Sequence, residues 1–213
     1  MKKLLRFVAL DFDGVIVDSM GLQEKAWRDA AREVTRDVKI EQTLVANLYS
    51  GYAGSRMFDG LDLSPHILKQ LRITKNQLWL RARDSAPIFP DAREVLRELH
   101  PFLAFGIGTT APRCYVDSVM RRAGLLGLIA AIVTNDDPPR PKPEAAFLHE
   151  LFTRAHYCRE ESVMVGDTRT DLHLAANAGV SFIGFGSQLS TDIGISCVSN
   201  WRSLCVELRR RAE

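Results

Sequence analysis

Residues 8–18 read VALDFDGVIVD, an apolar run that carries two aspartates one residue apart and a glycine directly after them. A buried carboxylate is costly unless it is paired or binds a metal. Side chains two residues apart in an extended segment point the same way, so Asp11 and Asp13 can face one ligand. The stretch therefore predicts a buried strand that ends at Asp11 and delivers two carboxylates to a site.

The composition is that of an ordinary globular protein. The chain has 213 residues, 46% hydrophobic and 25% charged, with a formal net charge of +2. Such a small charge gives no reason to expect a nucleic-acid partner, and the basic run at residues 209–211 is interpreted as a solvated helix end. The four cysteines have no CxxC spacing, and no segment reads as a signal peptide or as the ~18 apolar residues of a membrane span. We expect a cytoplasmic protein without a membrane partner.

Short apolar runs alternate with helical patterns along most of the chain. The expected strands are residues 7–10, 103–107, 128–133, 163–165 and 182–185, and the expected helices are residues 91–100, 112–124, 143–155 and 170–178. Alternation of this kind indicates βαβ units. It predicts an α/β fold with a doubly wound, Rossmann-like parallel sheet, which binds its ligands at the carboxyl ends of the strands.

One segment breaks the alternation. From Met20 to Ala86 the pattern is helical without a convincing strand; residues 77–84 form one helical stretch, and residues 61–66 read as a turn. This segment follows the first strand directly, so it is interpreted as an insertion. We expect a catalytic core of residues 1–18 and 87–213 and a helical cap of residues 19–86.

Two further motifs also fall where an expected strand ends or a helix begins. Residues 106–113 read GIGTTAPR and place Thr109 and Thr110 just before a helix, where hydroxyls and free backbone N–H groups suit a phosphate. Residues 140–147 read RPKPEAAF and place Lys142 just outside the start of another helix. Together they predict a pocket for a phosphoryl group.

The fourth motif adds two carboxylates. Residues 163–171 read VMVGDTRTD, and the four-residue spacing of Asp167 and Asp171 brings their side chains together in a helical turn. With Asp11 and Asp13, four carboxylates would converge on one sheet edge and repel each other. A hard divalent cation with oxygen ligands resolves this repulsion, and Mg²⁺ is the usual choice where phosphate is also bound.

The residue types also indicate a chemistry. An aspartate can attack phosphorus and form an aspartyl phosphate. A second aspartate can protonate the leaving oxygen and then deprotonate the attacking water. The paired carboxylates of the opening stretch are therefore interpreted as a nucleophile and an acid/base.

The segments DFDGVIVDS, GIGTTAP, KPEAAF and VGDTRTD, in this order, resemble the four motifs of the haloacid dehalogenase superfamily. The likeness covers nearly the whole chain and is to the phosphoglycolate phosphatase-like and beta-phosphoglucomutase-like members with a helical cap of the first type. On the matching positions, the resemblance implies that Asp11 is the nucleophile and a metal ligand, and that Asp13 is the acid/base and a metal ligand through its carbonyl. It implies that phosphate is bound by Thr109, Thr110 and Lys142. It also implies that Asp167 is a metal ligand and that Asp171 supports the metal shell.

We therefore expect a Mg²⁺-dependent phosphatase that acts on a small phosphorylated metabolite. A sugar-phosphate mutase of the same family is an alternative, although its cap usually carries a histidine four residues before the tryptophan, where this chain has Gln23 before Trp27. A non-catalytic protein that binds a phosphorylated ligand on the same scaffold is an alternative from another class. It would be expected to lack at least one motif residue, and the chain retains them all.

The cap offers few candidates for substrate recognition. Residues 48–57 read LYSGYAGSRM, in which Gly51 permits close backbone approach and Tyr52 and Arg56 can meet a ligand. By resemblance this segment faces the catalytic pocket, and Arg56 would pair with an anionic group of the substrate. A solvated surface turn is the other interpretation. Gln23 and Trp27 are the next candidates, with Trp27 alternatively part of the cap core.

Overall fold

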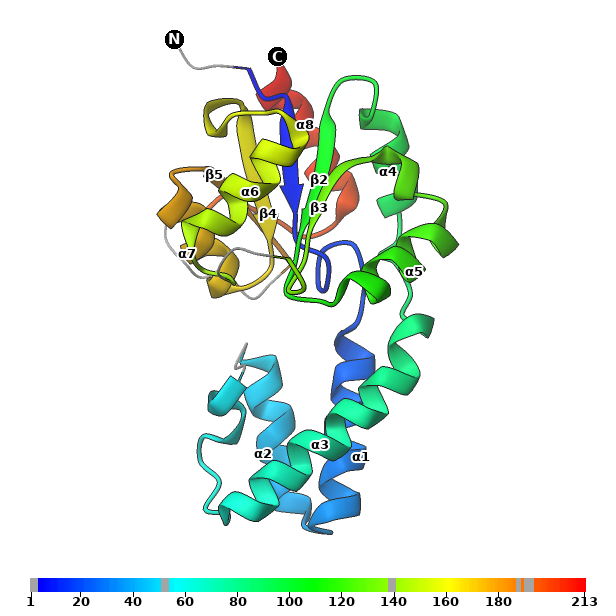
Figure 1. The fold of residues 1–213 in the computed structure, drawn as a ribbon, viewed down its shortest axis with the longest axis vertical. Coiled ribbons are helices and arrows are strands. Elements are labelled where there is room, and N and C mark those ends of the chain that lie inside the picture. The colour runs from blue at the N-terminus through cyan, green and yellow to red at the C-terminus, as the bar shows by residue number, and fades with distance from the viewer. Residues whose placement is uncertain (1–3, 51–53, 138–140, 187–188, 190–193) are drawn as a thin grey trace. The chain divides into compact units, whose positions relative to one another are not determined.

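A computed structural model describes residues 4–50, 54–137, 141–186, 189 and 194–213. It divides into two compact units, one of Met1–Asp18 and Pro87–Glu213 and one of Ser19–Ala86 (Figure 1). Gly51 and Tyr52, named above as cap candidates, lie outside the described residues. Among the helices of the described ranges, none is long and apolar enough to cross a membrane.

The larger unit is built on a six-stranded sheet in which every strand pair is parallel, in the order β3-β2-β1-β4-β5-β6. The strands are β1 (Phe7–Leu10), β2 (Ala104–Gly108), β3 (Ile129–Val133), β4 (Ser162–Gly166), β5 (Ser181–Phe185) and β6 (Cys197–Val198). The strand order reverses at β1, which pairs with both β2 and β4. This arrangement confirms the predicted doubly wound α/β fold.

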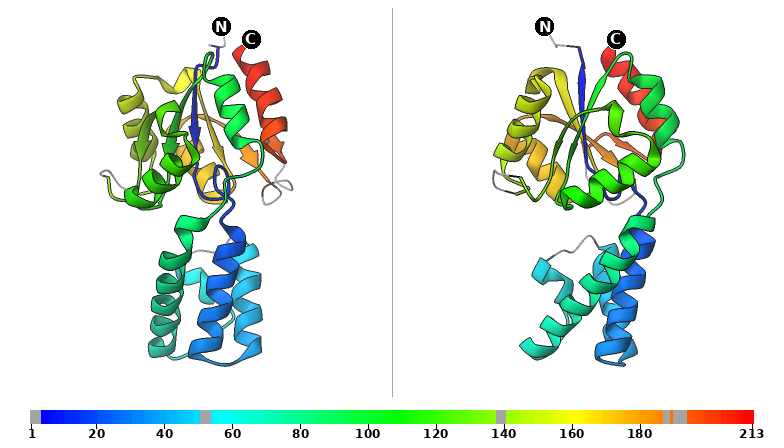
Figure 2. Two further views of the ribbon diagram at one scale, coloured as in Figure 1. Left: turned by 90° about the vertical axis from the view of Figure 1, so that its right-hand side faces the viewer. Right: turned by 45° about the vertical axis from the view of Figure 1, so that its right-hand side comes forward.

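Helices cover both faces of the sheet. They are α4 (Ala92–Leu99), α5 (Arg113–Ala123), α6 (Ala145–Ala155), α7 (Arg169–Ala178) and α8 (Trp201–Ala212). α6 and α7 lie on one face, and α4, α5 and α8 lie on the other (Figure 2). Because β1 is buried on both faces, all four of its side chains are apolar and fully inaccessible.

The last helix fixes the segment that follows β1. The indole Nε1 of Trp201 donates a hydrogen bond of 2.8 Å to the carbonyl of Val15, and Trp201 is completely buried. Its ring also packs against Phe185 at the end of β5, with ring centroids 6.1 Å apart. α8 therefore holds the loop that carries the paired aspartates against the sheet.

The smaller unit is a helical bundle of α1 (Met20–Val34), α2 (Val38–Tyr49) and α3 (Pro65–Ala82). Its core includes Trp27, Leu44 and Leu71. α3 is much longer than the stretch expected at residues 77–84. It begins within the segment interpreted as a turn, because Ser64 caps it by accepting a hydrogen bond from the Ile67 N–H and Pro65 occupies a favoured first position.

The role of α8 can be tested with Trp201→Phe. This change removes a donor from a buried carbonyl and leaves a small cavity, so it should lower the free energy of unfolding by about 2–3 kcal/mol. Thermal and urea unfolding of the purified protein measure the change. The same substitution at Trp79, which is only half-buried in α3, should cost less; equal stability of Trp201→Phe and the wild type would contradict the assignment.

Candidate active site

The carboxyl ends of two neighbouring strands bring three carboxylates together. Asp11 follows β1, and its N–H donates to the carbonyl of Val165 in β4 at 2.9 Å. Asp167 follows β4, and Asp171 lies in the first turn of α7. One oxygen from each of these aspartates lies within 4.8 Å of the others.

Lys142 bridges two of these carboxylates. Its Nζ donates to Asp11 Oδ1 at 2.8 Å and to Asp171 Oδ1 at 2.6 Å. Only 3% of the lysine side chain is exposed. The bridge joins residues that are far apart in the sequence, and it places a full positive charge between two buried negative charges.

Asp171 is held on its other oxygen as well. The hydroxyl of Thr168 donates to Asp171 Oδ2 at 2.6 Å, and the Asp171 N–H donates back to Thr168 Oγ1 at 3.3 Å. This capping box is built into the start of α7. Asp171 is therefore fixed by the helix end on one side and by Lys142 on the other.

Burial sets the electrostatics of the group. It raises the pKa of Asp11 to about 7; repulsion by Asp171 adds to the effect and Lys142 offsets part of it. Burial and the charges of Asp11 and Asp171 also raise the pKa of Asp167. Burial works to lower the pKa of Lys142, but its two carboxylate partners raise it above its ordinary value. Lys142 therefore stays protonated, whereas its single positive charge does not neutralise all three carboxylates.

The donor set fits a divalent cation. When all three are ionised, three carboxylates against one ammonium leave two net negative charges, and hard cations such as Mg²⁺ prefer oxygen ligands. Asp167 Oδ1 is buried without a hydrogen-bond partner among the described residues. A buried acceptor without a partner is costly, and a bound cation would supply one. Asp11 and Asp167 are the residues best placed to hold it.

Gly14 makes room for Asp167. Its φ is +82°, and a Cβ at this position would lie 2.0 Å from Asp167 Oδ2. Any other residue would collide with the carboxylate and would also be strained in this backbone conformation. The glycine of the opening motif therefore lets the loop pass directly beside the carboxylate group.

Asp13 has a different environment. It is half-buried, and its Oδ1 accepts a hydrogen bond of 3.3 Å from the hydroxyl of Tyr115 on α5. Tyr115 is buried, and its ring meets that of Phe12 edge to face with centroids 5.3 Å apart. Tyr115 lies 102 residues from Asp13, at an ordinary buried position of an amphipathic helix, so no local pattern in the sequence points to it.

The two threonines of the second motif differ in exposure. Thr109 is buried, its N–H donates to the carbonyl of Val133, and its Oγ1 accepts from the Ala111 N–H at 3.1 Å. Thr110 is exposed. Thr109 therefore shapes the turn after β2, and Thr110 presents its side chain to solvent.

The cap candidates are placed within their own unit. Trp27 is 6% exposed and packs edge to face on Phe58, so it belongs to the cap core. Gln23 is half-buried in α1. Arg56 lies in a short 3-10 helix, Gly54–Phe58, with its Nε 3.6 Å from a carboxylate oxygen of Asp59 and 64% of its side chain exposed.

A second polar network stabilises the segment after β3. Asp137 accepts hydrogen bonds from Arg113 at 3.1 Å, from Arg154 at 2.9 Å and from the Thr134 hydroxyl at 2.8 Å. Both arginines also donate to the carbonyl of Ile132. Asp137 therefore ties α5 and α6 to the end of β3, in the connection that leads to Lys142.

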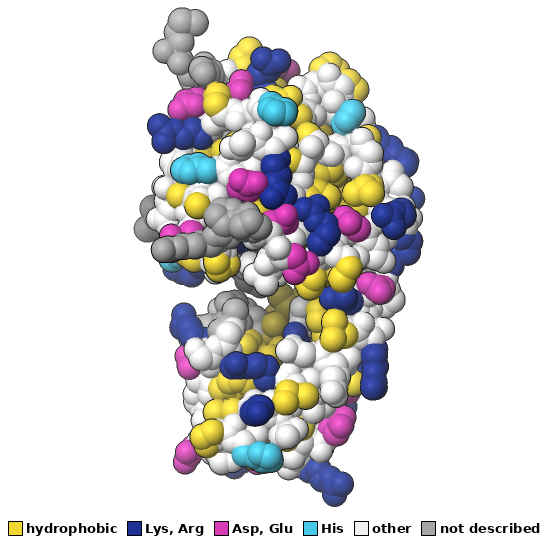
Figure 3. All heavy atoms as spheres, in the orientation of Figure 1, with side chains coloured by type: hydrophobic (Ala, Val, Ile, Leu, Met, Phe, Trp, Pro, Cys, Tyr) yellow, Lys and Arg dark blue, Asp and Glu magenta, His cyan; other side chains and the backbone are white. Residues whose placement is uncertain are grey.

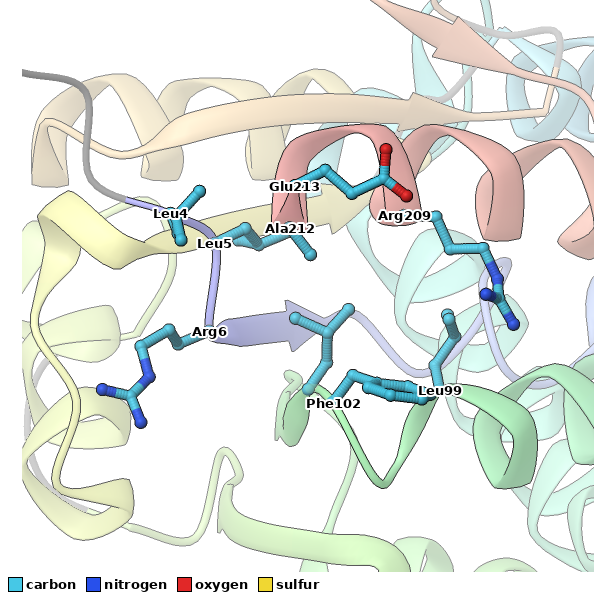
Figure 4. A pocket seen from close by; sticks show the side chains of 9 residues that line it. Leu4, Leu5, Arg6, Leu99, Phe102, Arg209, Ala212 and Glu213 are labelled. Atoms are coloured by element: carbon cyan, nitrogen blue, oxygen red, sulfur yellow. The ribbon is translucent and has the colours of Figure 1, made fainter.

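The larger unit also contains a cavity of about 550 Å³ beside the amino end of β1 (Figure 4). It is lined by Leu4, Leu5, Arg6, Leu99, Phe102, Leu103, Arg209, Ala212 and Glu213. These residues lie at the opposite end of β1 from Asp11. The face of this unit shown in Figure 3 carries interspersed basic and acidic side chains.

The family model described as haloacid dehalogenase-like hydrolase matches residues 8–185. A phosphoglycolate phosphatase of Vibrio cholerae is 25% identical over 191 residues, which cover 85% of this chain and 84% of the relative.

Solved structures share the fold. A HAD-superfamily hydrolase of subfamily IA from Geobacter sulfurreducens superimposes with a TM-score of 0.73 at 18% identity and covers 96% of each chain. A variant of CbbY from Rhodobacter sphaeroides, in complex with xylulose-(1,5)bisphosphate, gives a TM-score of 0.70 at 15% identity and covers 94% of this chain and 96% of its own.

The network around Asp137 predicts a pH-dependent stability difference. Burial works to raise the pKa of Asp137, but hydrogen bonds from Thr134 and Arg154 and the charge of Arg113 lower it below its ordinary value of 3.8. The ionised carboxylate therefore stabilises the fold above pH 3.8, and this contribution falls as the pH drops below that value. Asp137→Asn should lower the free energy of unfolding by about 1–3 kcal/mol at pH 7.

The penalty should shrink by ~1 kcal/mol between pH 5 and pH 3, where the unfolded chain takes up the proton first. Urea unfolding of wild type and variant at both pH values measures it. A penalty that stays constant or grows with acid would show that the charge of Asp137 is not what stabilises this segment.

Proposed function

Because the chain belongs to the haloacid dehalogenase-like hydrolase family, whose model matches residues 8–185, we propose that it is a Mg²⁺-dependent phosphatase. It hydrolyses a small phosphomonoester through an aspartyl phosphate on Asp11. The observation that carries the proposal is the group of three carboxylates, two of which are bridged by the buried ammonium of Lys142. A nucleophile, a fixed cation and oxygen ligands for a metal meet there at one sheet edge.

In the first step, a carboxylate oxygen of Asp11 attacks the phosphorus of the substrate. The bond between phosphorus and the leaving oxygen breaks, and Asp13 gives its proton to that oxygen. Lys142 favours the ionised form of Asp11 and holds it in place by donating to its Oδ1. By the family resemblance, Thr109 and Thr110 after β2 would bind the transferring phosphoryl group, and the buried Thr109 shapes the turn that carries both.

In the second step, water attacks the phosphorus of the aspartyl phosphate and gives a proton to Asp13. The bond from phosphorus to Asp11 breaks, which releases inorganic phosphate and restores both aspartates. When bound, Mg²⁺ would neutralise charge on the phosphoryl group and on the carboxylates. Asp11 and Asp167 would hold it, together with the Asp13 carbonyl that the family resemblance implies, while Asp171 orients Lys142.

Phosphoglycolate is the first substrate to test, because the Vibrio cholerae relative is named a phosphoglycolate phosphatase. Release of inorganic phosphate separates the alternatives. A phosphatase releases it continuously, a sugar-phosphate mutase returns the phosphoryl group to the sugar, and a binding protein does neither. The assay is run with Mg²⁺ and with excess EDTA on a panel of phosphomonoesters, and no Mg²⁺-dependent release on any member would contradict the proposal.

Asp11→Asn should reduce phosphate release by about 10³-fold or more, because an amide keeps the shape of the side chain but is a poor nucleophile. Steady-state assays on phosphoglycolate and p-nitrophenyl phosphate measure the loss. Asp117→Asn, on the half-exposed part of α5, is the matched control and should keep its activity. Activity of Asp11→Asn within tenfold of wild type would remove Asp11 from the role of nucleophile.

The metal requirement should depend more on Asp167 than on Asp171. Asp167 has a buried oxygen without a hydrogen-bond partner in the described part of the chain, whereas both oxygens of Asp171 are held by Lys142 and Thr168. We expect Asp167→Asn to raise the Mg²⁺ concentration for half-maximal activity by about 10–100-fold, and Asp171→Asn to raise it less. Titration of Mg²⁺ calorimetrically and against activity measures both variants; the reverse order would show that Asp171 is the direct ligand.

A further inference from the structure

Tyr115 meets the paired-aspartate segment in two ways. Its hydroxyl donates to Asp13 Oδ1 at 3.3 Å, and its ring packs edge to face on Phe12, the residue between the two aspartates. Tyr115 is 1% exposed and Phe12 is completely buried. One side chain of α5 therefore contacts both the carboxylate of Asp13 and the backbone segment that carries it.

Packing alone does not explain a tyrosine at this position. A phenylalanine would fill the same space against Phe12, and burying a phenolic hydroxyl costs free energy unless the hydroxyl has a partner. Asp13 supplies that partner from the first catalytic motif. The hydroxyl is therefore placed for its contact with Asp13.

We infer that Tyr115 is a positioning residue for Asp13, which it fixes for proton transfer to the leaving group of the substrate. This inference rests on the proposed function. The hydroxyl bonds to Oδ1 and so restricts the orientation of the carboxyl group that gives its proton to the leaving oxygen and later takes one from water. Tyr115 acts through this hydrogen bond and does not itself exchange a proton with the substrate.

The position of Asp13 matters most when the leaving group is poor. An alkoxide needs its proton as the bond to phosphorus breaks, whereas p-nitrophenolate leaves readily without one. Loss of the Tyr115 hydroxyl should therefore penalise alkyl phosphates selectively. The parameter to measure is kcat/KM, because it covers the steps up to the first transfer of the phosphoryl group and excludes the later attack of water.

Tyr115→Phe removes the hydroxyl and keeps the ring against Phe12. For an alkyl phosphate such as phosphoglycolate, we expect kcat/KM to fall by about 5–20-fold through kcat, a fraction of the ~10²–10⁴-fold that acid–base catalysis contributes. For p-nitrophenyl phosphate the loss should stay within about twofold. Tyr157→Phe is the matched control, because Tyr157 stacks on Phe7 at the other end of β1, with centroids 5.0 Å apart, away from the carboxylates.

A double-mutant cycle with Asp13→Asn tests whether Tyr115 acts through Asp13. In the Asp13→Asn background, Tyr115→Phe should change kcat/KM by less than about twofold, since the group that it positions is already lost. Circular dichroism and thermal unfolding of each variant show whether it is folded, and the cycle cancels any general loss of stability.

Equal losses on the alkyl and aryl substrates, no loss on either, or full additivity with Asp13→Asn would overturn the inference. A similar alkyl-selective loss in Tyr157→Phe would also overturn it. Failure of the proposed function is a separate result, because it shows in the wild type as absence of Mg²⁺-dependent phosphate release, before any variant is compared.

Discussion

The ammonium of Lys142, buried between Asp11 and Asp171, is the interaction on which the site depends. Three carboxylates whose oxygens lie within 4.8 Å of one another would repel strongly in a buried setting. The lysine compensates one of the three charges and fixes the geometry of two. When all three carboxylates are ionised, two negative charges remain, and this explains why this sheet edge suits a divalent cation.

The fold supplies the close approach that this group requires. β1 and β4 pair in parallel, with Leu10 opposite Val165, so the residues that follow them emerge side by side. The backbone at this edge is crowded. A Cβ on Gly166 would lie 2.3 Å from the Cβ of Asp171, and a Cβ on Gly14 would lie 2.0 Å from Asp167 Oδ2. The glycines in the first and fourth motifs are therefore required for the carboxylates to come together, because they let two loops and a helix end converge without side chains between them.

The parts of this arrangement that follow from local patterns could be predicted from the sequence. Apolar runs located β1 to β5 to within one residue at either end, and motifs at strand ends and helix starts pointed to Asp11, Lys142, Asp167 and Asp171. Contacts that depend on tertiary packing could not be predicted. Tyr115 occupies a buried position of an amphipathic helix, where hydrogen bonding to a residue 102 positions away leaves no local signal. β6 has two residues, too few for a period, and the start of α3 depends on the cap at Ser64 rather than on hydrophobic pattern.

The two aspartates of the opening motif are identical side chains with different surroundings, and the proposed mechanism gives them different roles. Asp11 is buried, and burial raises its pKa to about 7. Its hydrogen bond to the Lys142 ammonium partly offsets this effect, because the positive charge favours the ionised carboxylate. Such a partner suits a nucleophile, which must remain an anion. Asp13 is half-buried and bonded to a neutral hydroxyl. An acid/base must pass through both protonation states, and a neutral partner serves both, whereas a lysine would hold the group ionised and spoil it as an acid. In the proposed mechanism, the partners of the two aspartates therefore match the two roles: a cation beside the nucleophile and a hydroxyl beside the acid/base.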